Sequence, residues 1–305
     1  MTNLFSSFNK EIFSNYNLYV LVINIVVYLI YIFLNKEILE EYGFPYALIL
    51  TSIQFVFSFL TLWICLWLGL LEHKQLPLYE VLPVSLSYCS YISLSNLSLM
   101  LNPAYFYQFM GVISLFMLFI WRMHFYTMFS SLKMYAGFVG VGSGLWIVIT
   151  NSEVTFLGIT VALASVITGI LYDYLLYKKL NRLKVSAIQI LPYQLFISSC
   201  ITIPLSFYTL NSDIFVYPKF GAQLLILLSL VVSVFANISC FASHLLSDQT
   251  TNNIQWTVKM SGIMLIFVLM DKDQITLVNM FGIILTAVSI WCCSYLSKGV
   301  SNLIK

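Results

Sequence analysis

Charged residues are scarce in this chain of 305 residues, where Asp, Glu, Lys and Arg together make up only 9%. A soluble globular domain carries about 25% charged residues, so the composition excludes that class of protein. Hydrophobic residues make up 60% of the chain, and its mean hydropathy is +0.92. The net charge of +2 gives no indication of a nucleic-acid partner. The composition therefore predicts an integral membrane protein.

The chain also lacks the groupings of side chains that catalysis and metal binding require. Its histidines, His73, His124 and His244, are far apart in the sequence, no nucleophile pairs with a base, and no glycine-rich phosphate loop is present. The six cysteines lie inside apolar runs, where a cysteine behaves as a small hydrophobic residue. We therefore expect no enzymatic activity, no cofactor and no bound metal.

Apolar runs of about 20 residues recur from end to end, and each is long enough to cross a bilayer of about 30 Å. The polar breaks between them are too short for a second domain. The sequence predicts a single all-α membrane domain, residues 1–305, with ten transmembrane helices between tails 1–17 and 298–305. The predicted spans are residues 18–34, 45–71, 79–101, 103–121, 132–150, 155–177, 186–210, 220–245, 250–270 and 276–297.

The distribution of Lys and Arg predicts the orientation in the membrane. Ten of the 14 basic residues fall on one side of the predicted spans, three fall on the other side, and Lys259 lies inside a span. Basic residues favour the cytosolic side, so both termini are expected in the cytosol. An even number of spans also requires both termini on one side.

Short motifs recur about half the chain apart. FPY at residues 44–46 is echoed by LPY at 191–193, and NLS at 96–98 is echoed by NIS at 237–239. Five spans in each half would place the halves in opposite orientations, which is a transporter architecture with the substrate site between the halves. The predicted inverted repeats are residues 18–150 and 155–297.

Lys259 is the most informative single residue because it lies near the middle of the span 250–270. A lysine at such a depth costs about 3 kcal/mol or more in lipid, so it should face protein or water. Asn252 and Gln255 share its helix face, and Asn253 lies beside them. We interpret this face as a contact for an anionic, hydroxyl-rich solute, and a lysine that snorkels to the interface is the alternative.

The fourth span has a second polar face, formed by Tyr107 and Ser114, with Gln108 at its border. These side chains could line a cavity or could hold neighbouring helices together, and the sequence leaves both interpretations open. Other polar residues within apolar spans complete the set of candidate substrate-binding residues: Asn96, Tyr193, Gln194 and Asn237.

Asp173 lies in the sixth span, four residues before Tyr177 and five before Lys178. This position is close to the expected cytosolic end of the span. We favour a structural contact for Asp173, since no second buried carboxylate accompanies it, and a role in proton coupling is the alternative.

The fifth span is rich in glycine and contains a GxxxG pattern at Gly140 and Gly144. Small residues at this spacing allow two helix backbones to approach closely. The pattern predicts either packing within the monomer, which we favour, or a homodimer formed through this helix.

The chain resembles the nucleotide-sugar/triose-phosphate translocator branch of the drug/metabolite transporter superfamily. The resemblance runs from about residue 35 to residue 298 and depends on the order of several short motifs: Asn35-Lys36, Phe44-Pro45, Leu50-Thr51, Gln54, Asn96-Leu97-Ser98-Leu99, Tyr107-Gln108, Tyr193-Gln194, Asn237, Asn253 with Lys259, and Gly282. It implies a ten-helix antiporter in a lipid bilayer that exchanges a nucleotide sugar or sugar phosphate for a counter-substrate by alternating access. Because no plastid transit peptide is apparent, it also implies the Golgi or endoplasmic reticulum membrane.

Two departures from the family pattern concern the charge of the site. Members with a phosphate site commonly have a lysine shortly after the Tyr-Gln pair, but here Tyr107-Gln108 is followed by uncharged residues. Triose-phosphate translocators follow the counterpart of Lys259 with an arginine, and this chain has Met260. One cation instead of two or three keeps an alternative open, namely a carrier of a non-phosphorylated metabolite or a non-transporting regulatory membrane protein of the same fold.

Overall fold

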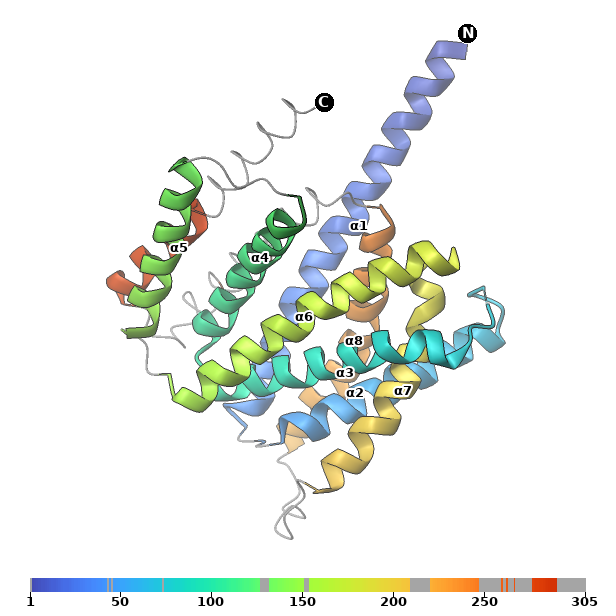
Figure 1. Cartoon of the computed structure of the whole chain (residues 1–305). Coiled ribbons are helices and arrows are strands. Elements are labelled where there is room, and N and C mark those ends of the chain that lie inside the picture. Colours follow the sequence, from blue (N-terminus) through green and yellow to red (C-terminus); the bar gives the residue numbers. More distant parts are fainter. Residues whose placement is uncertain are drawn as a thin grey trace.

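The computed structural model describes residues 2–42, 44, 46–72, 74–126, 132–150, 154–208, 220–246, 259, 262, 266 and 276–289. Within these ranges the chain is helical and forms no strand, so the predicted all-α class is confirmed. The labelled helices, shown in Figure 1, are α1 (Thr2–Leu39), α2 (Ala47–Trp67), α3 (Leu78–Leu101), α4 (Ala104–Tyr126), α5 (Leu132–Thr150), α6 (Phe156–Leu183), α7 (Ala187–Tyr208) and α8 (Phe220–Leu246).

Several of these helices are long and apolar enough to cross a membrane. They are Tyr19–Leu39, Ala47–Trp67, Phe156–Leu183, Ala187–Tyr208 and Gly221–Ala242. A shorter apolar helix, Leu277–Ser289, follows near the end of the chain. Of the predicted ninth span, 250–270, the described residues are Lys259, Gly262 and Ile266, and all three are helical.

Two helices continue past the polar residues at which their predicted membrane spans end. The predicted first span ends at residue 34, but α1 runs on through Asn35 and Lys36 to Leu39. The predicted sixth span ends at residue 177, but α6 continues to Leu183. Charged side chains need not end a helix when they find polar partners, and Lys36 finds backbone carbonyls of α3.

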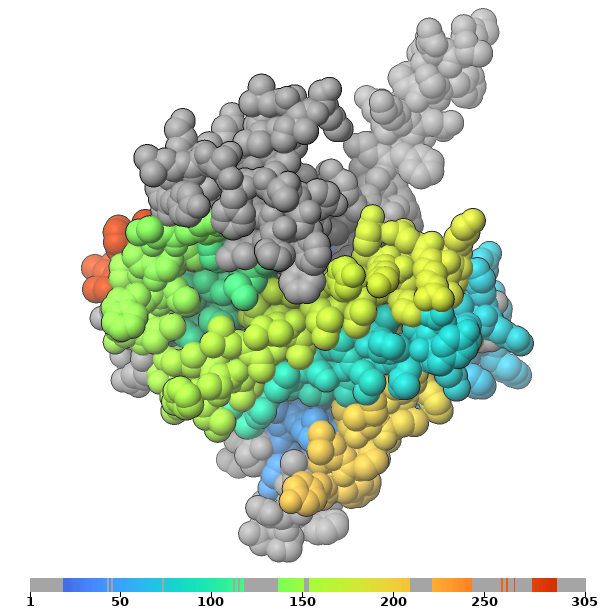
Figure 2. Space-filling model, viewed as in Figure 1, coloured from blue at the N-terminus to red at the C-terminus, as the bar shows by residue number. Residues whose placement is uncertain are grey.

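Helices from the two halves of the chain lie side by side. α3 packs along α6, α1 packs along α8, and α2 packs along α7, with further contacts of α2 with α8 and α3 with α7. In the space-filling view, α3 and α6 together form much of one face of the molecule (Figure 2). A large apolar cluster lies where α2, α3, α6, α7 and α8 meet, and Leu62, Val84, Leu191 and Phe241 are fully buried in it.

Polar contacts at both ends hold α3 antiparallel to α6. At one end, Glu80 at the start of α3 forms ion pairs with Lys179 and Arg182 near the end of α6. At the other end, the Asn102 side chain after α3 donates to the carbonyl oxygen of Gly158 in the first turn of α6, at 3.1 Å. The two helices are therefore aligned along their whole length.

The glycine-rich face of α5 packs against the chain's own helix Leu277–Ser289. A Cβ atom added to Gly144 would lie 2.2 Å from the Thr286 hydroxyl oxygen and 2.6 Å from the carbonyl oxygen of Gly282. A Cβ atom on Gly140 would lie 2.2 Å from the Ser289 hydroxyl oxygen. The GxxxG face is thus occupied within one molecule, so a homodimer would have to use another surface.

This contact predicts opposite outcomes for two glycines in the same helix. Gly144→Ala should lower the melting temperature of the purified protein, because overpacking a close contact costs about 1–3 kcal/mol. Gly142→Ala is the matched control, since a Cβ atom there has nothing within 4 Å, and alanine favours a helix by about 1 kcal/mol over glycine. Equal melting temperatures of the two variants in detergent would contradict this packing.

Candidate functional site

A buried network of side-chain amides joins α1, α2 and α3. The Asn35 amide donates to the Asn96 carbonyl oxygen at 3.2 Å, and the Asn96 amide donates to the Thr51 hydroxyl at 2.8 Å. Gln54 donates to the Asn35 side-chain oxygen at 2.9 Å and accepts from the Tyr31 hydroxyl at 3.0 Å. Because no water is available inside a bilayer, such mutual pairing fixes the positions of the helices.

A second set of hydrogen bonds extends this connection to α8. The Tyr88 hydroxyl donates to the Asn237 side-chain oxygen at 2.6 Å, and the Asn237 amide donates to the Ser58 hydroxyl at 3.4 Å. Ser58 is also 3.2 Å from the Ser233 hydroxyl. The α2, α3 and α8 helices are therefore linked through polar groups on their shared side.

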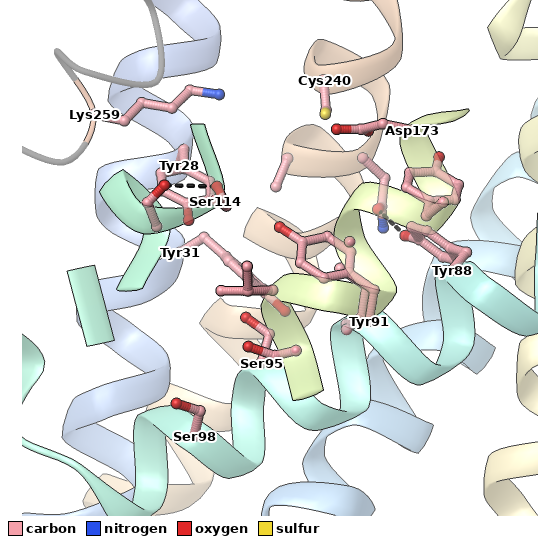
Figure 3. A pocket seen from close by; sticks show the side chains of 18 of the residues that line it. Tyr28, Tyr31, Tyr88, Tyr91, Ser95, Ser98, Ser114, Asp173, Cys240 and Lys259 are labelled. Carbon is pink, nitrogen blue, oxygen red and sulfur yellow. Dashed lines mark hydrogen bonds between the residues drawn. The ribbon is translucent and has the colours of Figure 1, made fainter. Parts of the chain in front are cut away.

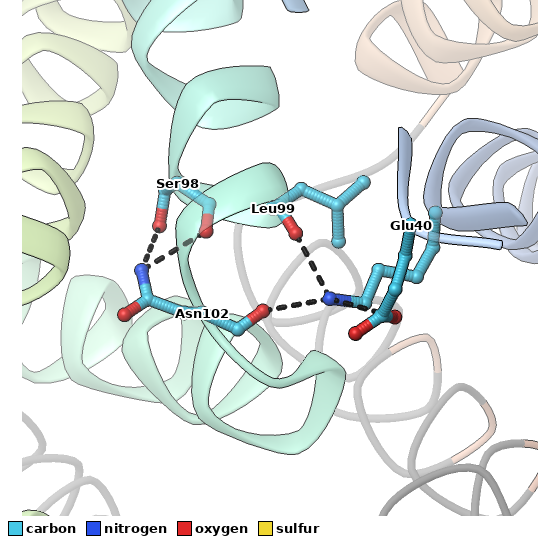
Figure 4. A network of polar contacts seen from close by, with 5 residues as sticks. Glu40, Ser98, Leu99 and Asn102 are labelled. Carbon is cyan, nitrogen blue, oxygen red and sulfur yellow. Dashed lines mark hydrogen bonds and ion pairs between the residues drawn. The ribbon is translucent and has the colours of Figure 1, made fainter. Parts of the chain in front are cut away.

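Lys36 is a buried lysine with a structural role. Its ammonium group donates to the carbonyl oxygens of Leu99 at 3.2 Å and Asn102 at 2.8 Å, and it pairs with Glu40 at 3.1 Å (Figure 4). These carbonyls are at the C-terminal end of α3, where helix carbonyls lack partners and the helix dipole attracts a cation. Lys36 thus caps α3 from the end of α1.

A cavity of about 150 Å³ opens where α1, α2, α3, α4, α6 and α8 converge (Figure 3). One water needs about 15 Å³ of such volume, so the cavity has room for about ten waters and can hold a polar solute. The first half of the chain contributes Tyr28, Tyr88 and Ser95, among others, and the second half contributes residues such as Ser165 and Lys259. Both halves therefore form its walls.

The cavity wall is rich in tyrosine. Among the described residues that line it are Tyr28, Tyr31, Tyr88, Tyr91, Tyr107 and Tyr172. The rings of Tyr91 and Tyr172 stack with centroids 6.3 Å apart, and the ring of Tyr88 lies 5.2 Å from that of Tyr172. Gly169 leaves room for this arrangement, since a Cβ atom there would lie 2.9 Å from the Tyr91 ring. Such a wall offers both aromatic faces and hydroxyl groups.

Lys259 enters this cavity from the second half of the chain. Lys259 is only 4% exposed, and its ammonium group lies 4.8 Å from the centroid of the Tyr28 ring. Figure 3 shows the side chain extending into the space above Tyr28, toward the side where Asp173 and Cys240 lie. A cation over an aromatic face gains about 0.5–2 kcal/mol, so Tyr28 holds the amine in place without neutralising its charge.

The structure brings three of the predicted site residues, Lys259, Tyr107 and Asn237, to the cavity. The Tyr107 hydroxyl is 2.7 Å from that of Ser95, so this tyrosine both lines the cavity and contacts a neighbouring helix. Asn252, Asn253 and Gln255 lie outside the described residues, and the predicted shared face with Lys259 stays a prediction.

The other four predicted site residues do not line the cavity. Asn96 belongs to the amide network, and Gln108 and Gln194 are fully buried. Tyr193 lies on α7, and its hydroxyl reaches the turn before α3, where it accepts from the Leu76 backbone amide at 3.2 Å and donates to the Lys74 carbonyl oxygen at 3.0 Å. Their assignment as substrate-binding residues stays a prediction.

Most of these tyrosines, and Asp173, which also lines the cavity, were not predicted as site residues from the sequence. A signal for the tyrosines was present on α3, where Tyr88, Tyr91, Ser95 and Ser98 repeat at helical spacing and form one polar stripe. Tyrosine is common at membrane interfaces, so the stripe was not distinctive by itself. Within the described residues, no cluster of three His, Cys, Asp or Glu side chains could hold a metal ion.

Comparison with known proteins gives relatives along most of the chain. It is 28% identical over 269 residues to UDP-xylose transporter 2 of Arabidopsis thaliana, covering 86% of this chain and 76% of that protein. It is 27% identical over 264 residues to UDP-rhamnose/UDP-galactose transporter 2 of the same plant, covering 83% and 75%. The chain is a relative of nucleotide-sugar transporters. The family resemblance predicted from the motifs is thereby confirmed.

The relatives' names describe transporters and not enzymes, in agreement with the prediction that this protein is not an enzyme. No protein-family model matches the sequence. A solved crystal structure with 12% sequence identity superposes with a TM-score of 0.57, over 91% of this chain and 98% of the other. This likeness supports the helix arrangement alone.

The two buried lysines predict different responses to the same substitution. Lys36→Met should lower the melting temperature in detergent, because it leaves buried carbonyl oxygens unpaired at a cost of about 1–3 kcal/mol. Lys259→Met should change it little, since the lost cation–π contact is offset by the removal of a buried charge. A larger loss of stability in Lys259→Met than in Lys36→Met would contradict these assignments.

Proposed function

We propose that this protein is a secondary transporter that exchanges a nucleotide sugar or sugar phosphate for a counter-substrate across an internal membrane. The observation that carries the proposal is the cavity of about 150 Å³ between the two halves, which is lined by tyrosines and has Lys259 in its wall. The relatives named as UDP-sugar transporters support the same substrate class. In this proposal the cavity is the substrate site and the helices around it alternate between two accessible states.

The helix contacts support ten helices in two inverted repeats within a single domain. In two five-helix repeats, α1 corresponds to α6, α2 to α7 and α3 to α8. Replacing each helix by its counterpart converts the α1–α8 contact into the α6–α3 contact. The same replacement leaves α2–α7 unchanged and relates α2–α8 to α7–α3 and α2–α3 to α7–α8, and all of these pairs are in contact. The pairing of α5 with Leu277–Ser289 fits the fifth and tenth helices of such a scheme.

The chemistry of the cavity fits a solute with an anionic part and a hydroxyl-rich or aromatic part. Among the described lining residues, Lys259 is the only cation, and an ammonium group binds phosphate as a point charge. Tyrosine rings can stack on a planar base, and hydroxyls of tyrosine and serine can pair with sugar hydroxyls. A nucleotide sugar has all three of these parts.

The positions of basic residues at the two ends of α3 support cytosolic termini. Lys74, Lys179 and Arg182 meet where α3 begins and α6 ends, and the Lys74 ammonium contacts the Lys184 carbonyl oxygen at 3.2 Å. Lys36, predicted to lie on the opposite side, caps the other end of α3. In our proposal the Lys74 end faces the cytosol, and the membrane is that of the Golgi or endoplasmic reticulum.

A non-phosphorylated metabolite is the second candidate substrate. Asp173 lines the same cavity as Lys259, so one negative charge accompanies the single cation. A site with balanced charges attracts a dianionic diphosphate less strongly than a purely cationic site does. The transport experiment must therefore include a neutral sugar.

The decisive experiment is counter-exchange in proteoliposomes preloaded with UMP, GMP or inorganic phosphate. Wild type should exchange at least one labelled nucleotide sugar or sugar phosphate, and Lys259→Ala should lose at least about tenfold in exchange, because a charge-assisted hydrogen bond contributes about 1.5–3 kcal/mol. Lys178→Ala is the matched control: it removes an exposed lysine outside the cavity and should leave exchange unchanged.

Each other outcome has a definite meaning for the proposal. Exchange that survives in Lys259→Ala keeps the carrier and rejects Lys259 as the phosphate contact. Uptake of an unphosphorylated sugar, with no exchange of phosphorylated solutes, identifies the second candidate. If the wild type transports none of these solutes, the transporter proposal fails and a regulatory membrane protein of the same fold is favoured.

A further inference from the structure

Asp173 lines the cavity that we propose as the substrate site. It lies on α6 one turn after Gly169, and Figure 3 shows its carboxylate directed toward the same end of the cavity as the Lys259 ammonium group, near Cys240. Among the described residues that line the cavity, it is the only carboxylate. From the sequence, a structural contact near the cytosolic end of the span is expected for this residue.

An ionisable side chain within a membrane-spanning helix is costly and marks a functional site by default. A carboxylate repels phosphate, so Asp173 cannot share the contact that Lys259 makes with an anionic group. Its two oxygen atoms are strong acceptors that suit neighbouring O–H donors. Adjacent hydroxyls on a sugar ring are such donors, and the Asp or Glu that binds ribose in dinucleotide sites uses the same chemistry.

The surroundings of Asp173 hold it in a defined position. Tyr172, the preceding residue, is 5% exposed and its ring packs against both Tyr88 and Tyr91. Those two tyrosines belong to the polar stripe of α3, which α6 contacts along its length. The carboxylate is therefore presented by a packed helix pair, as a site that discriminates between solutes requires.

We propose that Asp173 binds the sugar part of the solute by accepting hydrogen bonds from adjacent ring hydroxyls, while Lys259 contacts the phosphate. The proposal rests on the proposed nucleotide-sugar transport and adds the residue that selects a sugar. The hydroxyls can belong to the ribose of the nucleotide or to the transported sugar, since both carry the same chemistry. The two sources give different results below.

The test compares the inhibitory potencies of competitors within each variant. The ratio of two such potencies is independent of the amount of folded protein. Exchange of labelled UDP-xylose is inhibited by unlabelled UDP-xylose, UDP or 2′-deoxy-UDP, on wild type and on Asp173→Asn, which keeps the shape and removes the charge. If Asp173 binds the transported sugar, the preference for UDP-xylose over UDP falls about tenfold or more in the variant. If it binds ribose, the preference for UDP over 2′-deoxy-UDP falls instead.

Glu72→Gln is the matched control, because it makes the same chemical change at an exposed carboxylate between α2 and α3. Its two preference ratios should equal those of the wild type. Ratios that stay unchanged in Asp173→Asn, with wild-type exchange intact, overturn the role of Asp173 and leave the transporter proposal standing. A uniform loss of affinity for all three competitors also overturns it and assigns Asp173 to the charge balance of Lys259. Absence of nucleotide-sugar exchange in the wild type overturns both proposals together.

Discussion

Polar groups inside a bilayer have no water to bind, and the arrangement of this protein depends on how they are paired. The amide network of Asn35, Gln54 and Asn96 ties α1, α2 and α3 together, and Asn237 extends the ties to α8. Each of these side chains would be costly if it faced lipid alone. Because they satisfy one another, the helices can approach only in a particular register.

The two buried lysines show how one residue type takes on different roles under this constraint. Lys36 finds fixed partners in the carbonyls that α3 leaves unpaired at its end, so its charge is used for structure. Lys259 lies over the ring of Tyr28 in the wall of a cavity. An aromatic face stabilises a cation, and in the proposed function Lys259 is the contact for an anion that enters and leaves.

The candidate site lies between helices of the two halves, which pack against each other. Among the described helices, α3 with α6 and α1 with α8 are the most extensive pairings, and each joins a helix of the first half to one of the second. A cavity walled by both halves can change its access when the halves move relative to each other. The aromatic stack of Tyr91 on Tyr172 bridges one such pair directly at the cavity.

The sequence by itself determined the membrane class, the all-α fold, the approximate helix positions and that Lys259 faces protein and not lipid. These follow from hydropathy and from the cost of a charge in lipid, which are local properties of the chain. Only the tertiary structure decided that Asn96 pairs with other amides, that Tyr193 contacts a turn, and that Asp173 faces the cavity. The sequence does not distinguish a buried polar residue that pairs with another helix from one that lines a cavity, because the difference depends on which helix lies opposite.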